Sequence, residues 1–140
     1  MNKIVVAAGI IVAIALVSGV LLYFNQPLEM GEPNGAAYVD VSAEEAKNLI
    51  DTNPDLVVID VSPHYNEGHL PGAVHHYLGD GSLDAAIPSL DPNGKYLVYC
   101  HVDSVAISGA QKLIDAGFTT VYRLEGNYAA WLAAGYPIET

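Results

Sequence analysis

The longest hydrophobic run of the chain stands at its beginning. Residues 4–24 are 21 consecutive positions without a charged side chain. At about 1.5 Å per helical residue, this run extends over roughly 30 Å, the thickness of the hydrocarbon core of a bilayer. The alternative is a signal sequence, whose apolar core is usually only about 7–15 residues long. We therefore predict that residues 1–26 contain one transmembrane helix that anchors the protein to the membrane, with a cleaved signal sequence as the alternative.

The residues on either side of this run predict its orientation. Lys3 precedes it, whereas Glu29 and Glu32 follow it, and no basic residue occurs again before Lys47. Positively charged flanks stay in the cytoplasm. We predict a single-pass membrane protein with a cytoplasmic N-terminus and its remaining residues outside the cytoplasm. Residues 27–37 contain two prolines and two glycines, which is typical of a linker.

Beyond residue 37, short apolar runs alternate with helical patterns. The runs that predict strands are residues 38–41, 56–60, 96–99 and 119–122, and the patterns that predict helices are residues 43–51, 104–116 and 128–134. Ser42 and Glu45 have the spacing of a capping box at the start of the first helix, and Gly117 stands where a glycine commonly ends a helix. This alternation predicts an α/β domain with a parallel sheet and helices on both faces.

Composition narrows the possible functions of this domain. The chain has 16 acidic and 5 basic residues, a net charge of −11, which repels nucleic acid and excludes it as a partner. Cys100 is the only cysteine, so a disulfide framework and a multi-cysteine metal site within one chain are excluded. Five histidines lie within 38 residues, at positions 64, 69, 75, 76 and 101. We interpret them as solvated or structural side chains and predict no metal site and no cofactor.

Cys100 is the candidate reactive residue. It follows the apolar run 96–99 and precedes a predicted helix, and ligands of parallel α/β sheets bind beyond the carboxyl ends of the strands. A helix N-terminus and converging backbone N–H groups lower the pKa of a thiol and bind anions. The alternative is an inert thiol in the core, because cysteine is among the most buried residue types.

Four short segments together resemble the rhodanese-like (sulfurtransferase) domain over residues 38–140. They are residues 58–61, residues 68–73, residues 97–100, and residues 124–126 together with Trp131. The resemblance implies a five-stranded parallel sheet flanked by helices, preceded here by the transmembrane helix. It also implies that Cys100 is the nucleophile and carries sulfane sulfur as a persulfide. The substrate-binding loop implied by the resemblance consists of His101, Val102, Asp103, Ser104 and Val105.

The chain departs from the common family pattern in three respects. Asp103 stands where many members have glycine, and no Lys or Arg occurs between Lys95 and Lys112, although many members have a basic residue in this loop. Asn127 stands where the family often has a second glycine, and asparagine tolerates a positive φ. We favour a carboxylate of Asp103 that faces the loop cavity and opposes a dianionic donor by like-charge repulsion. The alternative is that Asp103 caps the helix that begins near Ser104.

Two hypotheses for the function follow. In the first, the protein is a membrane-tethered, extracytoplasmic sulfurtransferase that moves sulfur from thiosulfate or polysulfide to a thiol or cyanide acceptor through Cys100. In the second, the domain is catalytically weak and serves as a binding or accessory subunit of a membrane complex. The retained cysteine favours the first hypothesis, and Asp103 favours the second.

Overall fold

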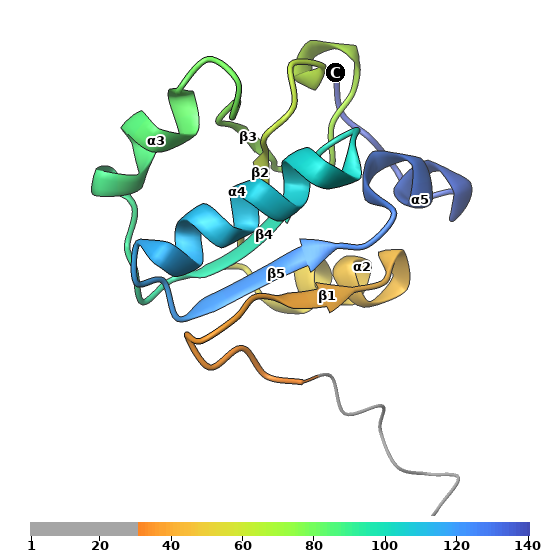
Figure 1. Cartoon of the computed structure of the whole chain (residues 1–140). Coiled ribbons are helices and arrows are strands. Elements are labelled where there is room, and N and C mark those ends of the chain that lie inside the picture. Colours follow the sequence, from red (N-terminus) through yellow and green to blue (C-terminus); the bar gives the residue numbers. More distant parts are fainter. Residues whose placement is uncertain (1–30) are drawn as a thin grey trace, which may run out of the picture. The chain divides into compact units, whose positions relative to one another are not determined.

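The computed structural model describes residues 31–140 (Figure 1). Among these residues, no helix combines the length and the apolar character needed to span a bilayer. The predicted transmembrane segment at residues 4–24 lies outside the described residues, and so do the first four residues of the predicted linker.

Five parallel strands form one sheet in the order β1-β5-β4-β2-β3. The strands are β1 (Val39–Val41), β2 (Val57–Asp60), β3 (Val74–His75), β4 (Lys95–Tyr99) and β5 (Thr120–Leu124). The predicted α/β fold with a five-stranded parallel sheet is therefore confirmed. The sequence runs predicted four of these strands but not β3, because β3 has only two residues and both are exposed.

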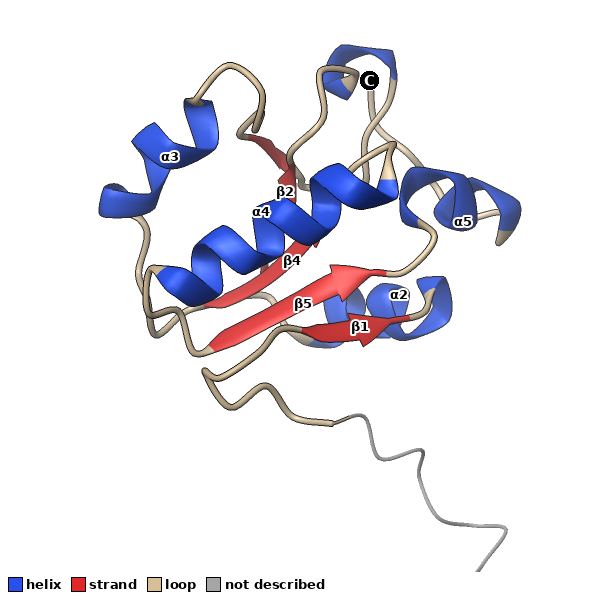
Figure 2. Cartoon of the chain, viewed as in Figure 1, coloured by secondary structure: helices blue, strands red, loops and turns tan. Residues whose placement is uncertain are grey.

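Helices cover both faces of this sheet. They are α2 (Ala43–Thr52), α3 (Ser82–Ala86), α4 (Asp103–Asp115) and α5 (Asn127–Ala133), with short 3-10 helices η1 (Tyr65–Glu67) and η2 (Ile87–Ser89). Figure 2 shows α3 and α4 on one side of the sheet and α2 with α5 on the other. The helix α3 was not predicted, since its single turn and a half is too short to show a periodic pattern.

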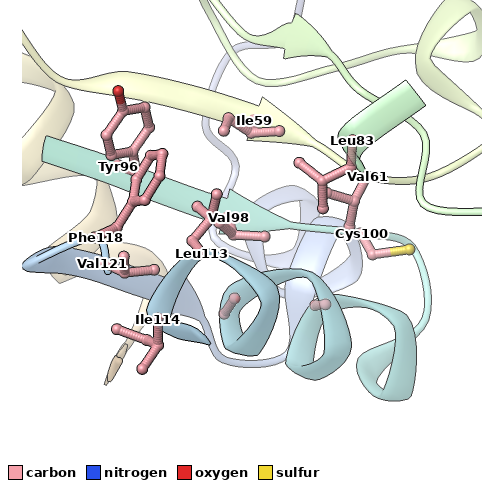
Figure 3. Packing of buried hydrophobic residues seen from close by; sticks show 12 residues of the cluster. Ile59, Val61, Leu83, Tyr96, Val98, Cys100, Leu113, Ile114, Phe118 and Val121 are labelled. Carbon is pink, nitrogen blue, oxygen red and sulfur yellow. The ribbon is translucent and has the colours of Figure 1, made fainter. Parts of the chain in front are cut away.

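The central strand β4 brings its side chains into the main hydrophobic core. Tyr96, Val98 and Cys100 point to the same side, because alternate residues of a strand share a face. They pack against buried residues of α4, among them Leu113 (Figure 3). A Cβ atom at Gly109 of α4 would lie 3.2 Å from the Val61 side chain, so this glycine lets the helix approach the sheet closely.

Local sequence signals account for the start of α2 and for the end of α4. The capping box at α2 is confirmed, since Ser42 Oγ accepts a hydrogen bond from the backbone N–H of Glu45 and the Glu45 carboxylate accepts one from the backbone N–H of Ser42. The predicted helix at residues 104–116 corresponds to α4, which is followed by Gly117 at φ +90°. It begins at Asp103, one residue earlier than predicted.

Candidate functional site

Cys100 lies where the central strand of the sheet ends. It follows the last residue of β4, and the two residues His101 and Val102 connect it to α4. The residue is only 1% exposed and belongs to the core cluster, with Val61 and Leu83 beside it in Figure 3. The only thiol of the protein therefore stands at the carboxyl edge of a parallel sheet, as the sequence predicted, and it is also buried.

Three influences act on the Cys100 thiol. Burial raises its pKa, because the thiolate loses hydration. Hydrogen bonds from the backbone N–H groups of Val102 and His101 to the sulfur lower the pKa, and the negative charge of Asp60 raises it again. The net effect is a pKa above the ordinary value of a thiol, because burial outweighs the two backbone N–H groups.

Asp60 is a fully buried carboxylate at the end of β2, the strand next to β4. Its Oδ1 accepts a hydrogen bond of 2.8 Å from the backbone N–H of Ser62, and its Oδ2 accepts one of 2.8 Å from the hydroxyl of Tyr99. Burial and the charge of Asp60 raise the pKa of Tyr99, which also accepts a hydrogen bond from the backbone N–H of Leu70. Asp60 thus organises the turn after β2 and holds two segments together near the cysteine.

His101 follows the cysteine and stacks on another ring. Its ring lies 4.1 Å from that of Tyr128, measured between centroids, and 5.2 Å from that of His64. The Nε2 atom of His101 is buried and has no hydrogen-bond partner among residues 31–140. Burial lowers the pKa of His101, so the uncharged ring is the favoured form next to Cys100.

Asp103 does not face the cysteine, and our favoured interpretation of its carboxylate was wrong. Its Oδ1 accepts hydrogen bonds from Arg123 Nη1 and, at 2.7 Å, from Asn127 Nδ2. The carboxylate that raises the pKa of Cys100 is that of Asp60. The alternative, that Asp103 caps the helix, is also wrong. Asp103 is the first residue of α4, the N-cap position is Val102, and no side chain caps this helix.

Arg123 is the residue that sequence reasoning missed. It lies in β5 and is 5% exposed, and its Nε donates a hydrogen bond of 2.6 Å to Asp40 Oδ1 of β1. A signal was present in the sequence: an arginine stands inside an otherwise uncharged strand, and a buried charge requires a partner. The partner Asp103 could not be identified without the arrangement of β5 beside β4.

Asn127 connects this ion pair to the cysteine. As predicted, it has a positive φ, +56°, and it is buried. Its Oδ1 accepts a hydrogen bond of 3.2 Å from the backbone N–H of Cys100, while its Nδ2 donates to Asp103. The next residue, Tyr128, donates its backbone N–H to the carbonyl oxygen of Cys100 at 3.1 Å.

The remaining predicted loop residues take different positions. Val102 is 55% exposed and stands at the cap position of α4. Ser104 and Val105 lie in the first turn of α4, and Val105 packs against the core. Of the five predicted loop residues, only His101 and Val102 lie between Cys100 and α4. Asp103, Ser104 and Val105 belong to the first turn of α4.

Two histidines stack on Tyr65 in the segment from β2 to β3. The Tyr65 ring lies between those of His69 and His75, with centroids 3.8 and 4.8 Å away. His64 Nδ1 lies 3.0 Å from Glu67 Oε1. Within residues 31–140, no group of three or more His, Cys, Asp or Glu side chains is arranged to hold a metal ion. These histidines are engaged in stacking and hydrogen bonds.

Comparison with known proteins gives a consistent result. The family model described as "Rhodanese-like domain" matches residues 42–134. The thiosulfate sulfurtransferase GlpE of Coxiella burnetii is 34% identical over 98 residues, which are 69% of this chain and 89% of the relative. The rhodanese-like domain of the Alr3790 protein from Anabaena sp. is 32% identical, with a TM-score of 0.65 over 71% of this chain and 77% of that one. The polysulfide-sulfur transferase homodimer of Wolinella succinogenes is 29% identical, with a TM-score of 0.61 over 73% of this chain and 78% of that one.

Proposed function

The chain belongs to the rhodanese-like domain family, and from this premise we propose that Cys100 carries sulfane sulfur as a persulfide. The donor is thiosulfate or a polysulfide, and the acceptor is a thiol or cyanide. The observation that carries the proposal is the placement of the only thiol directly after β4 and two residues before the N-terminus of α4.

The reaction divides into two displacements at sulfur. Cys100 first loses its proton to solvent, and the thiolate attacks the outer sulfur of the donor. A new S–S bond forms on Cys100 while the donor S–S bond breaks, and its electron pair leaves with sulfite or with a polysulfide shortened by one sulfur. The acceptor then attacks the outer persulfide sulfur and releases the Cys100 thiolate. The oxidation level of the protein is restored, so no cofactor is needed.

The residues around the sulfur fit the anionic intermediates of this sequence. Backbone N–H groups at the start of a helix stabilise negative charge on a thiolate or on the terminal sulfur of a persulfide. The His101 ring is uncharged, and the side chain of Val102 is apolar and exposed. Neither side chain brings a positive charge to the sulfur, so the backbone amides are the groups that stabilise an anion there. Asp103 is held by Arg123 and does not oppose an anionic donor directly.

Intact-mass measurement of the purified full-length chain tests this proposal. After incubation with thiosulfate or polysulfide, the chain should gain the mass of one sulfur atom, and subsequent cyanide should remove it. The variant Cys100→Ser should gain nothing. A wild-type chain that stays unmodified with both donors would overturn the proposal.

One observation favours a second function in a different class. Cys100 is almost fully buried, and burial raises its pKa, which are properties of an unreactive thiol. A domain with such a thiol would serve as a binding or accessory subunit of a membrane complex. In that case the chain would gain no sulfur, while it would co-purify from solubilised membranes with its partner subunits.

Membrane tethering through residues 4–24, with the domain outside the cytoplasm, is part of the proposal. It is supported by the 21 uncharged residues and by Lys3 in front of them. Protease added to intact spheroplasts should digest the domain and leave a cytoplasmic control protein intact. Protection of the domain, or a mature N-terminus after Gly19, would contradict tethering in this orientation.

A further inference from the structure

The two positions at which the chain departs from the family pattern contact each other. Asn127 Nδ2 donates a hydrogen bond of 2.7 Å to Asp103 Oδ1, although the two residues are 24 positions apart. A glycine at either position would remove this contact. The two departures therefore form one structural feature.

A buried cation joins the same pair. Arg123 uses Nη1 on Asp103 and Nε on Asp40, so one guanidinium connects the start of α4 with β1 and β5. Its side chain is 6% exposed, whereas the carboxylates of Asp40 and Asp103 are about half exposed. The guanidinium holds Asp103 in place, and Asp103 in turn holds the amide group of Asn127.

The oxygen of the Asn127 side-chain amide binds the backbone of Cys100. Cys100 donates its backbone N–H to Asn127 Oδ1, and its carbonyl oxygen accepts the N–H of Tyr128. Both polar groups of the Cys100 backbone are thus bound to consecutive residues of α5. His101 and Val102 connect Cys100 to Asp103, so Asn127 binds both residues that flank this two-residue loop.

We propose that Arg123, Asp103 and Asn127 form a clamp of positioning residues that fixes the backbone of Cys100 and of Asp103 and thereby sets the position of the His101 and Val102 amides beside the cysteine. In the terms of the proposed function, on which this inference rests, the clamp orients the donors that stabilise the thiolate and the persulfide. None of the three side chains is required to touch the substrate.

The variant Asn127→Gly tests the clamp without straining the backbone, because glycine accepts the positive φ of this position. The readout is the rate of alkylation of Cys100 by iodoacetamide against pH, measured on the purified full-length chain. The midpoint of the profile reports the stability of the thiolate, whereas the plateau reports access of the reagent. We expect Asn127→Gly to move the midpoint upward by about one pH unit, since the amide donors lose their alignment.

A control variant and a variant cycle isolate this effect. Asn93→Gly changes an exposed asparagine in a turn and should leave the midpoint unchanged. Asp103→Gly removes a negative charge in addition to the contact, so it is compared in two backgrounds, the wild type and Asn127→Gly. The shift of the alkylation midpoint caused by Asp103→Gly should be about half a pH unit more upward in the wild type than in Asn127→Gly. Only the wild type contains the hydrogen bond between Asp103 and Asn127 that the change removes.

The outcomes are distinguishable from those of the proposed function, since alkylation does not require sulfur transfer. An unchanged midpoint in Asn127→Gly, or equal effects of Asp103→Gly in both backgrounds, would overturn the clamp. If Asn127→Gly alters the urea midpoint of Trp131 fluorescence strongly, exchange of the Cys100 amide proton decides instead. This exchange should accelerate in Asp103→Gly, whose side chain is exposed, and an unchanged exchange rate would also overturn the clamp.

Discussion

Replacement of Arg123 by methionine should destabilise the domain although it removes a buried charge. Met is a flexible apolar side chain that fills much of the volume of the arginine stem. The substitution removes two charge-assisted hydrogen bonds, to Asp40 and to Asp103. It also breaks the connection of these two carboxylates through a common cation.

The size of the effect follows from the exposure of the partners. A hydrogen bond to a charged group contributes about 1.5–3 kcal/mol when it is buried. Here the guanidinium is 6% exposed, but the carboxylates of Asp40 and Asp103 are 46% and 60% exposed and regain hydration after the change. Each lost hydrogen bond therefore lowers the free energy of unfolding by an amount at the low end of this range. The loss is partly offset because the desolvation penalty of the guanidinium disappears as well. We expect a net loss of about 2 kcal/mol in the free energy of unfolding.

Urea unfolding of the full-length chain measures this loss. Trp131 is the only tryptophan and is fully buried, so its fluorescence reports unfolding of the domain. With a slope of about 1.5 kcal/mol per M, the midpoint should fall by roughly 1.3 M. The control Lys112→Met breaks an exposed pair with Asp84 and should change stability by about 0.5 kcal/mol or less. An Arg123→Met midpoint equal to or above that of the wild type would refute the reasoning and show that burial of the guanidinium costs as much as its pairing contributes.

Three further substitutions test other parts of the structure. Cys100→Ala should abolish sulfur uptake in the mass measurement and lower stability by about 1 kcal/mol, because one buried sulfur atom is lost from the core. Asp60→Asn should move the alkylation midpoint of Cys100 downward, since the carboxylate charge opposes the thiolate. In the wild type, the raised pKa of Cys100 means that the alkylation rate still increases above pH 9.0. A wild-type midpoint below pH 9.0 would contradict this. Ser42→Ala should lower the urea midpoint by the equivalent of about 1 kcal/mol, because the backbone N–H of Glu45 loses its capping partner, and an unchanged midpoint would contradict a contribution from the capping box.

The sequence by itself determined the class of the fold and the position of the candidate nucleophile. Apolar runs at 56–60 and 96–99, which alternate with helical patterns at 43–51 and 104–116, predicted buried parallel strands, and the capping box at Ser42 predicted the start of α2. These features depend on neighbours within a few positions of the chain, where periodicity and capping act. The placement of Cys100 at a strand end before a helix follows from the same local pattern.

Only the tertiary structure decided what surrounds the cysteine. The contacts of Asp103 with Arg123 and Asn127 span 20 and 24 residues, and that of Arg123 with Asp40 spans 83. They exist because β5 lies between β1 and β4 in the sheet. A charged side chain in a sequence has no defined partner until the strand order is known, so the sequence left Asp103 as a charge near the cysteine. In the folded domain that carboxylate binds the buried guanidinium of Arg123. A buried cation without a partner is costly, whereas the exposed Asp103 carboxylate keeps much of its hydration when it forms the pair.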